Sequence, residues 1–312
     1  MLTTVSSRLA LALVVALGTS AAGCGKKKDK DPAPTEVVKV GGGTGTAAGT
    51  GAGTAAGTGA GTAAGTGSGT AAVAPTTPVI TAAASIADAV AAADRPADDK
   101  ALDAGRKPVE MLTFLHVTAG MKVAEIFAGG GGTVELLARV VGPTGVVYGQ
   151  NTKEVLEKFA EKPWSARLAR LASPSIIRVD RDLSSPLPPE AKDLDLVVMH
   201  LVYHDTVWLG ADRTGMNGAI WAALKPGGEF AVIDHSAKDG TGADAAKDLH
   251  RIEKSFVQNE IEATGFKLDR ESDLFKHPED TRDWSASPAV AGAQRGQSDR
   301  FFLVFKKPVD AK

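Results

Sequence analysis

Hydrophobic and polar positions divide the chain into a stretch without large apolar residues and a longer stretch of regular alternation. Residues 41–72 consist only of Gly, Ala, Thr and Ser, and the unit Gly-Thr-Ala-Ala-Gly-Thr-Gly-Ala recurs within them. This repeat has no large side chain to bury, so it cannot offset the entropy that ordering would cost. We therefore expect residues 25–84 to form a flexible tether and residues 85–312 to form the folded domain.

In the second stretch, short apolar runs alternate with amphipathic ones, which predicts strands alternating with helices. The first expected strand begins at residue 123. The later ones cover residues 146–149, 176–179, 194–199, 229–233, 266–268 and 300–306. The expected helices cover residues 86–90, 106–115, 133–141, 152–159, 164–171, 218–224 and 249–264. Such alternation indicates an α/β domain with a mostly parallel sheet covered by helices on both faces.

The turn between the first strand and the following helix contains four consecutive glycines, Gly129–Gly132. Glycine permits tight turns at positive φ and lets a ligand approach the main chain, while the helix N-terminus offers free N–H groups. The spacing differs from G-x-G-x-x-G. It is closer to E-x-G-x-G-x-G, with Glu125, Gly129 and Gly131 in place and Phe127 at the first glycine position. The turn indicates a nucleotide-type site, and a tight turn without a ligand is the alternative.

Composition and charge narrow the classes of partner. The chain has 312 residues, of which 43% are hydrophobic, and a formal net charge of −2. This composition can fill a core of ordinary size. The near-neutral charge gives no electrostatic footprint for a phosphate backbone, so we expect no nucleic acid partner.

Residues 1–24 have the pattern of a targeting segment. Arg8 precedes an apolar run at residues 9–18, which is too short to span a bilayer permanently. Small residues follow, and then comes Cys24, the only cysteine of the chain. The segment resembles a bacterial lipoprotein signal, which implies lipidation of Cys24 and a membrane-anchored lipoprotein exported to the periplasmic side. A plain secretory signal and a misassigned start codon are the alternatives, and the protein is cytoplasmic if the signal is not used.

Several short motifs resemble those of one family. The most specific is Leu224-Lys225-Pro226-Gly227-Gly228, and further matching stretches are residues 120–125, 148–151, 203–208 and 234–236. Together they resemble class I S-adenosylmethionine-dependent methyltransferases, and more narrowly a family of predicted bacterial methyltransferases with the same modified glycine loop. The resemblance covers residues 106–308. It implies the class I methyltransferase fold, a Rossmann-like, mostly parallel seven-stranded sheet with helices on both faces.

The same resemblance implies an enzyme that uses S-adenosyl-L-methionine to methylate an unidentified acceptor, expected to be a small molecule. The Asn-Pro-Pro-Tyr type motif of amino-group methyltransferases is absent from the sequence, which argues against nucleic-acid and protein amide acceptors. The alternative function is a non-catalytic binding module on a lipid tether, with a degenerate methyltransferase fold. Phe127 and Asn151, which depart from the family pattern, fit this alternative.

In open α/β sheets, ligands bind beyond the carboxyl ends of the strands, so residues that follow strands are the candidates for cofactor binding. The resemblance implies that Gly129 and Gly131 approach the methionine part of the cofactor. It also places a ribose-binding acid where Asn151 stands, and an adenine-binding group where Asp180 stands. The full set of expected cofactor-binding residues is Glu125, Gly129, Gly131, Asn151, Asp180 and His200.

These candidates also have structural interpretations. Glu125 would cap the turn, Asn151 would be a turn residue, and Asp180 would pair with a neighbouring arginine. His200 would be a hydrogen-bonded histidine of the core. Phe127 would either pack against the sheet or fill part of the cofactor cleft.

Methyl transfer needs an aligned acceptor and, for an OH or NH nucleophile, the removal of a proton. The expected catalytic residues are His204, Asp205 and His235, which follow the fourth and fifth strands. Neighbours in sequence need not touch, so the sequence does not establish a pair between His204 and Asp205, and both histidines also have an interpretation as polar loop residues. Tyr203 and Trp208 are candidates for an acceptor pocket or for the core.

The remaining histidines, His116, His250 and His277, are scattered along the chain without the spacing of metal ligands. We therefore expect no metal site from the sequence.

Overall fold

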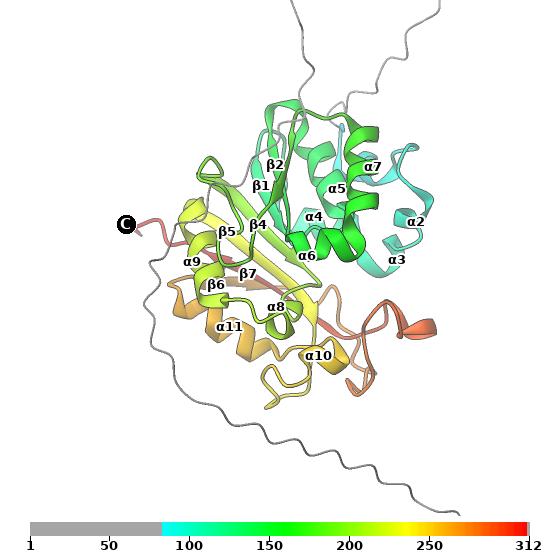
Figure 1. The fold of residues 1–312 in the computed structure, drawn as a ribbon, viewed down its shortest axis with the longest axis vertical. Coiled ribbons are helices and arrows are strands. Elements are labelled where there is room, and N and C mark those ends of the chain that lie inside the picture. Colours follow the sequence, from blue (N-terminus) through cyan, green and yellow to red (C-terminus); the bar gives the residue numbers. More distant parts are fainter. Residues whose placement is uncertain (1–82, 311–312) are drawn as a thin grey trace, which may run out of the picture. The chain divides into compact units, whose positions relative to one another are not determined.

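The computed structural model describes residues 83–310 (Figure 1). The expected signal segment with Cys24, and residues 25–82 of the expected tether, lie outside the described residues. The first helix begins at Ile86, and the side chain of Ser85 caps it by accepting a hydrogen bond from the N–H group of Asp88. Within residues 83–310, no helix is both long enough and apolar enough to cross a membrane.

The described strands form one sheet in the order β3-β2-β1-β4-β5-β7-β6. The strands β1 to β5 are parallel to their neighbours among themselves, and β7 is antiparallel to both β5 and β6. This arrangement confirms the expected Rossmann-like, mostly parallel seven-stranded sheet. The strand bounds are β1 Lys122–Ile126, β2 Val146–Asn151, β3 Ile176–Asp180, β4 Leu194–His200, β5 Leu224–His235, β6 Lys267–Glu271 and β7 Arg300–Lys306.

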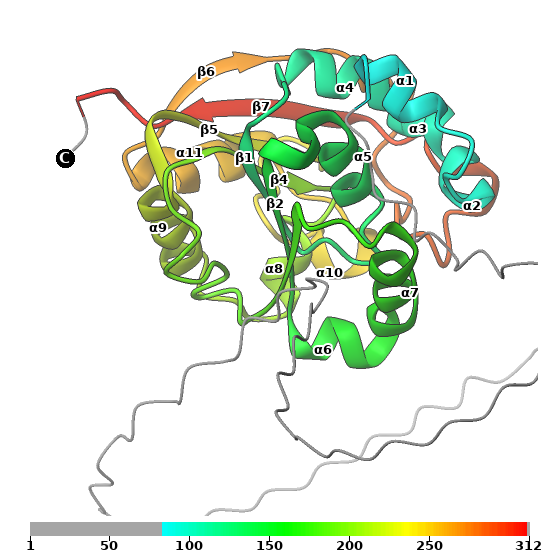
Figure 2. The same ribbon diagram turned by 90° about the horizontal axis from the view of Figure 1, so that it is seen from above.

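Helices cover the sheet on both faces, as Figures 1 and 2 show together. The helices α4, α5 and α7 lie on one face, and α9 and α11 lie on the other (Figure 2). The helix bounds are α1 Ile86–Ala91, α2 Ala97–Lys100, α3 Asp103–Arg106, α4 Pro108–Phe114, α5 Gly132–Val141, α6 Lys153–Val155, α7 Glu161–Leu171, α8 Asp205–Trp208, α9 Arg213–Ala223, α10 Ala246–Leu249 and α11 Lys254–Ala263. A π-helical turn, Leu156–Ala160, joins α6 to α7.

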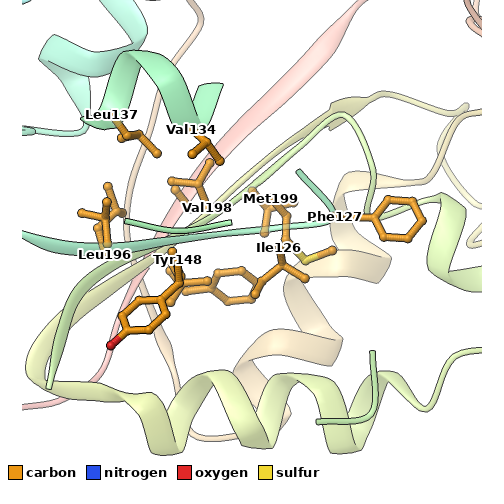
Figure 3. Close-up of a cluster of buried hydrophobic side chains, with 14 of the residues drawn as sticks. Ile126, Phe127, Val134, Leu137, Tyr148, Leu196, Val198 and Met199 are labelled. Atoms are coloured by element: carbon orange, nitrogen blue, oxygen red, sulfur yellow. The ribbon is translucent and has the colours of Figure 1, made fainter. Parts of the chain in front are cut away.

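The helix α5 shows how the apolar pattern forms the core. Val134, Leu137 and Val141 recur at helical spacing, and all three side chains are fully buried. Figure 3 shows Val134 and Leu137 above the strand residues Leu196 and Val198. Burial of each such side chain contributes roughly 1.5–3 kcal/mol to stability. The helix therefore fixes the position of the glycine turn from which it begins.

One predicted helix is wrong. The amphipathic pattern predicted a continuous helix over residues 249–264, but α10 ends at Leu249 and α11 begins at Lys254. Between them His250 takes the left-handed conformation with φ of 50°, and Ile252 forms a parallel bridge with Ser236 just beyond β5. The backbone groups near Ile252 therefore bond to the end of the central sheet instead of forming a helical turn. The sequence pattern did not predict this pairing, because its partner strand lies nearby only in the folded protein.

Candidate functional site

A cavity of about 1060 Å³ lies at the carboxyl ends of the central strands, within the described part of the chain. Its wall includes Phe127 directly after β1, Leu201 directly after β4, and His235 at the end of β5. The order of the sheet reverses between β1 and β4, which is the place where open α/β sheets bind ligands. Ligand pockets have volumes of about 300–1,000 Å³. The cavity is therefore large enough for a molecule of cofactor size.

The glycine turn presents main chain to this cavity. Gly129, at φ of 55°, lines the cavity, and a Cβ atom placed on it would meet nothing within 4 Å. Gly131, at φ of 76°, has a different role, because a Cβ atom there would lie 2.1 Å from the ring of Trp164. The structure therefore places Gly129 at the site, whereas Gly131 allows close packing of α7 against the turn.

Phe127 occupies the first glycine position of the motif at φ of 66°. This left-handed conformation is rare for a bulky residue, and it is held by a hydrogen bond that the Phe127 N–H donates to Gln150 Oε1 over 2.9 Å. The ring is itself buried in the hydrophobic cluster that contains Ile126 and Met199, and Figure 3 shows it at the edge of that cluster. The ring forms one wall of the cavity, and it leaves the volume given above open.

Asn151 lies at the end of β2, fully buried beneath the glycine turn. Its Oδ1 accepts a hydrogen bond from the Gly129 N–H over 2.8 Å, and its Nδ2 donates one to the Gly129 carbonyl over 3.0 Å. The side chain thus clamps both polar groups of Gly129. It does not line the cavity, so the structure places this expected ribose ligand in support of the turn.

Asp180 ends β3 and also lies outside the cavity wall. Both of its carboxylate oxygens accept hydrogen bonds from Arg178 Nε, each over 2.9 Å. Arg178 in turn pairs with Glu161 at the start of α7. This geometry matches the structural interpretation of Asp180, a partner of a neighbouring arginine.

Glu125 and Arg106 lie together at the cavity wall. Burial raises the pKa of the Glu125 carboxyl to about 8, against the opposing influence of Thr133 and of the Arg106 charge. Its Oε2 atom is buried and has no hydrogen-bond partner among the described residues. Burial also lowers the pKa of Arg106. Within residues 83–310 the guanidinium of Arg106 forms no ion pair and donates no hydrogen bond, so it is available to an anionic group in the cavity.

His200 ends β4 and lines the same cavity. Its Nδ1 lies 3.4 Å from Thr133 Oγ1, and its Nε2 is buried without a partner among the described residues. Burial lowers the pKa of His200 well below 6.5, and the charges of Arg106 and Arg300 act in the same direction. The ring is therefore a neutral imidazole at physiological pH.

The three expected catalytic residues come together at the cavity. His204 Nε2 lies 3.0 Å from Asp205 Oδ1, so these sequence neighbours do form a pair. His204 Nδ1 lies 2.8 Å from Oδ1 of Asp234, a buried residue of β5. Burial disfavours a charge on His204, but Asp234 and Asp205 outweigh it and raise its pKa to about 10. His204 is thus an imidazolium ion between two carboxylates.

His235 differs from His204 in its protonation. Its Nδ1 lies 2.6 Å from Ser298 Oγ. Burial lowers the pKa of His235 well below 6.5, and the nearby charge of His204 acts in the same direction. The two rings lie 5.8 Å apart between centroids. The site therefore holds one charged and one neutral histidine side by side.

The structure adds three residues to which the sequence analysis assigned no role. His250 lies beside His204, with its Nδ1 3.2 Å from His204 Nε2. Asp234 orients His204, and Arg106 approaches the cavity from the leading segment, residues 83–107, which contains α1 to α3. The sequence signal for Asp234 was its place at the end of a strand beside His235. His250 and Arg106 carried no such signal, because they belong to segments outside the strand ends.

The two aromatic candidates, Tyr203 and Trp208, lie in different surroundings. Tyr203 is fully buried, and its hydroxyl group donates a hydrogen bond to Glu260 Oε2 over 3.2 Å, so it is a core residue. Trp208 is 40% exposed and lines the cavity, and so does Phe159, which is 63% exposed. These rings form an apolar rim.

Comparison with solved structures gives several structural neighbours. No model of a known protein family matches the sequence. A SAM-dependent methyltransferase from Aquifex aeolicus is 16% identical, with 68% of this chain and 98% of that chain covered at a TM-score of 0.47. CrArsM from Chlamydomonas reinhardtii, an arsenic(III) S-adenosylmethionine methyltransferase, is 15% identical, with 72% and 73% covered at a TM-score of 0.45.

A third neighbour is fibrillarin from Aeropyrum pernix, crystallised with natively bound S-adenosyl-L-methionine. It is 11% identical, with 61% of this chain and 67% of that chain covered at a TM-score of 0.39. At such identities and scores, these neighbours assign no cofactor, substrate or residue role to this chain.

Proposed function

We propose that this chain is an S-adenosyl-L-methionine-dependent methyltransferase that acts on a small-molecule acceptor. The observation that carries the proposal is the cavity of about 1060 Å³ at the switch point of the sheet, with the open main chain of Gly129 in its wall. The apolar rim of Trp208 and Phe159 and the formal net charge of −2 favour a small molecule over a nucleic acid.

The residues at the cavity fit this cofactor. Arg106 offers a guanidinium that has no ion pair or hydrogen bond within residues 83–310, which suits the carboxylate of the methionine part. Glu125 offers a buried carboxyl oxygen, Oε2, that has no partner in the described part of the chain. Because the pKa of Glu125 is about 8, the group is mostly protonated at pH 7 and can donate a hydrogen bond. Gly129 and Gly130 leave the main chain accessible. Asn151 supports the cofactor only through Gly129, because its amide group is already bonded there.

When bound, the cofactor supplies an electrophilic methyl group on a sulfonium. This chain's own residues then have two tasks. The walls of the cavity align the acceptor with this methyl group, and proximity of this kind can lower a barrier by about 7–11 kcal/mol. His235, held neutral at physiological pH, accepts the proton of an OH or NH acceptor. Both ring nitrogens of His204 already contact carboxylates, Nδ1 that of Asp234 and Nε2 that of Asp205, so His204 fixes the wall of the cavity beside His235.

Titration calorimetry with S-adenosyl-L-methionine tests the proposal directly. We expect one molecule bound per chain, and we expect Gly129→Leu to weaken binding by about 100-fold, or about 2.8 kcal/mol. The matched control is Gly227→Leu. Gly227 has φ of 78° and equally open surroundings, but it lies among the first residues of β5 and not at the cavity.

Two outcomes would contradict the proposal in different ways. Absence of heat with the wild type at millimolar cofactor would reject the methyltransferase and leave the non-catalytic binding module as the function. Equal loss of affinity in both leucine variants would mean that strain at a left-handed position, rather than contact at Gly129, caused the effect.

We further propose that the protein is a lipoprotein tethered to a membrane through Cys24. The support is the sequence pattern of residues 1–24. Acyl chains contribute about 0.8 kcal/mol for each buried CH₂ group. In fractionated cells we expect the wild type in the membrane fraction and Cys24→Ala in the soluble fraction. A soluble wild type would reject the tether without affecting the proposed enzyme activity.

A further inference from the structure

Three side chains converge where two loops meet at the cavity. His204 Nε2 lies 3.0 Å from Asp205 Oδ1 and 3.2 Å from His250 Nδ1, and Asp205 Oδ1 lies 3.5 Å from His250 Nδ1. Two of these residues lie at the start of α8, and the third directly follows α10. The cluster therefore exists only because the fold brings α8 and α10 together.

From this geometry we propose that His204, Asp205 and His250 form a binding site for a divalent transition-metal ion. Two imidazole nitrogens and one carboxylate oxygen are a frequent set of three protein ligands for such ions. The three atoms form a nearly equilateral triangle. A tetrahedral ion with bonds of about 2.0–2.1 Å places its ligand atoms roughly 3.3–3.4 Å apart, and the observed edges bracket that separation.

Neighbouring side chains orient two of the three proposed ligands through hydrogen bonds, as is typical of metal sites. Asp234, fully buried, contacts His204 Nδ1 through Oδ1 and accepts the backbone N–H of His204 through Oδ2 over 2.7 Å. A carboxylate behind the distal ring nitrogen fixes the orientation of a metal-binding histidine. Trp208 Nε1 donates a hydrogen bond to Asp205 Oδ1 over 2.9 Å and so orients the second ligand.

The backbone fixes the third ligand. His250 takes φ of 50°, and the Ile252 N–H donates a hydrogen bond to the His235 carbonyl over 2.9 Å. This bridge to the end of β5 interrupts the helix that the sequence pattern predicted. The conformation turns His250 toward α8, and its ring centroid lies 5.2 Å from that of His204.

The donor set decides the class of ion. Two nitrogen ligands favour Zn²⁺, Co²⁺ and Fe²⁺ over Mg²⁺ and Ca²⁺, which prefer oxygen ligands alone. All three side chains line the cavity, so a position on the ion faces the space where an acceptor would lie. An open position is typical of metal sites that act on a substrate. The site stands independently of the proposed methyl transfer and is tested without it.

The experiment uses the full chain with Cys24→Ser, because this change removes the only thiol of the chain. The protein, stripped with a chelator, is titrated with Co²⁺, followed by visible ligand-field absorption, and then with Zn²⁺ against a chromophoric chelator. We expect one Co²⁺ ion bound per chain and its displacement by Zn²⁺. His250→Asn should weaken Zn²⁺ binding by on the order of 100-fold. Asn tolerates the left-handed conformation, so circular dichroism should show an intact fold.

The matched control is His277→Asn. His277 is also paired with a carboxylate, and its side chain is 26% exposed, compared with 27% for His250. This variant should bind as the wild type does. A second variant, Asp234→Asn, leaves all three ligands in place and should change the Co²⁺ spectrum and weaken binding by about 10-fold to 100-fold.

Two results would overturn the inference. One is the absence of a one-to-one Co²⁺ or Zn²⁺ complex in the wild type, which would mean that the cluster holds only the His204 proton. The other is equal affinity in His250→Asn and the wild type. Neither result bears on calorimetry with S-adenosyl-L-methionine, so the failure of this site and the failure of the proposed function remain distinguishable.

Discussion

Glu125 marks the point at which a strand of the core becomes the wall of a cavity. Its side chain is nearly fully buried at the end of β1, between the paired residues Gly149 and Val198 of the neighbouring strands. Taking a carboxylate out of water is costly, so burial favours the neutral acid. The raised pKa of Glu125 makes the stability of the protein depend on pH.

The sign of this dependence follows from the two states. In the unfolded chain Glu125 loses its proton near its ordinary pKa of 4.5, whereas in the folded protein it keeps the proton up to about pH 8. This group therefore makes the free energy of unfolding fall by about 1.4 kcal/mol per pH unit between these limits. Below pH 4.5 its contribution is fully present, and above pH 8 it has been lost.

We expect Glu125→Gln to remove that loss. Urea unfolding of both proteins at pH 5, 6.5 and 8 should show the variant gaining stability relative to the wild type as pH rises, because the amide does not ionise in either state. The exposed Glu157→Gln is the control and should change stability by less than about 1 kcal/mol at each pH. A difference between Glu125→Gln and the wild type that is constant with pH would show that Glu125 ionises normally in the folded protein.

Asn151 shows how a residue can serve a site without facing it. Both polar atoms of its amide are bonded to Gly129, so an acid at this position would turn a carboxylate oxygen toward the Gly129 carbonyl. The resemblance to methyltransferases implied an acid here. In this chain the amide is required by the hydrogen bonds that hold the turn, since only an amide both donates and accepts.

At the scale of elements, a buried carboxylate joins α5 and α7 to the leading segment. Glu135 in α5 is fully buried and accepts hydrogen bonds from Arg139, Arg167 and Arg170. Arg167 also pairs with Asp99 over 2.7 Å, and Arg139 pairs with Asp94 over 2.7 Å. The leading segment, which carries Arg106 to the cavity, is thus attached in part through charges centred on one residue.

Glu135→Gln should therefore loosen this attachment. It leaves three guanidinium groups around a neutral amide, and breaking a buried ion pair costs about 3–5 kcal/mol. Relative to the wild type, we expect lower stability in urea and faster amide hydrogen exchange in residues 86–106. The acceleration should be greater there than in β4 and β5. Glu154→Gln, which removes an exposed pair with Lys158, should change neither by a measurable amount. Unchanged exchange in the leading segment of Glu135→Gln would mean that apolar packing, not this network, holds it.

Two glycines allow α7 to pack against the sheet. A Cβ atom at Gly149 of β2 would lie 2.8 Å from the ring of Trp164, and one at Gly131 would lie closer still. The buried Trp164 ring therefore lies directly on the main chain of β2 and of the glycine turn. This contact and the clamp by Asn151 hold the turn from two sides.

At the scale of the whole domain, the sheet order creates the site. Because β4 lies next to β1, the glycine turn after β1 lies beside His200 at the end of β4. Because β5 is the next strand, Asp234 and His235 lie at the same edge. The chain beyond β5 then returns through the Ser236–Ile252 bridge and brings His250 to His204. Residues from Pro96 to Ala289 consequently meet around one cavity.

The sequence by itself determined the order and kind of most elements, because short apolar runs and helical spacing reflect burial of local segments. It also placed the glycine turn and the strand-end residues His204, Asp205 and His235 at one edge, since parallel strands end together. Only the tertiary structure decided what Asn151 and Asp180 bond to, that Gly131 packs against Trp164, and that His250 joins His204. These contacts depend on partners far away in the chain, and their hydrogen bonds exist only once the sheet has brought those partners together. The same reason explains the wrong helix at residues 249–264, where a local pattern was overridden by pairing with the end of β5.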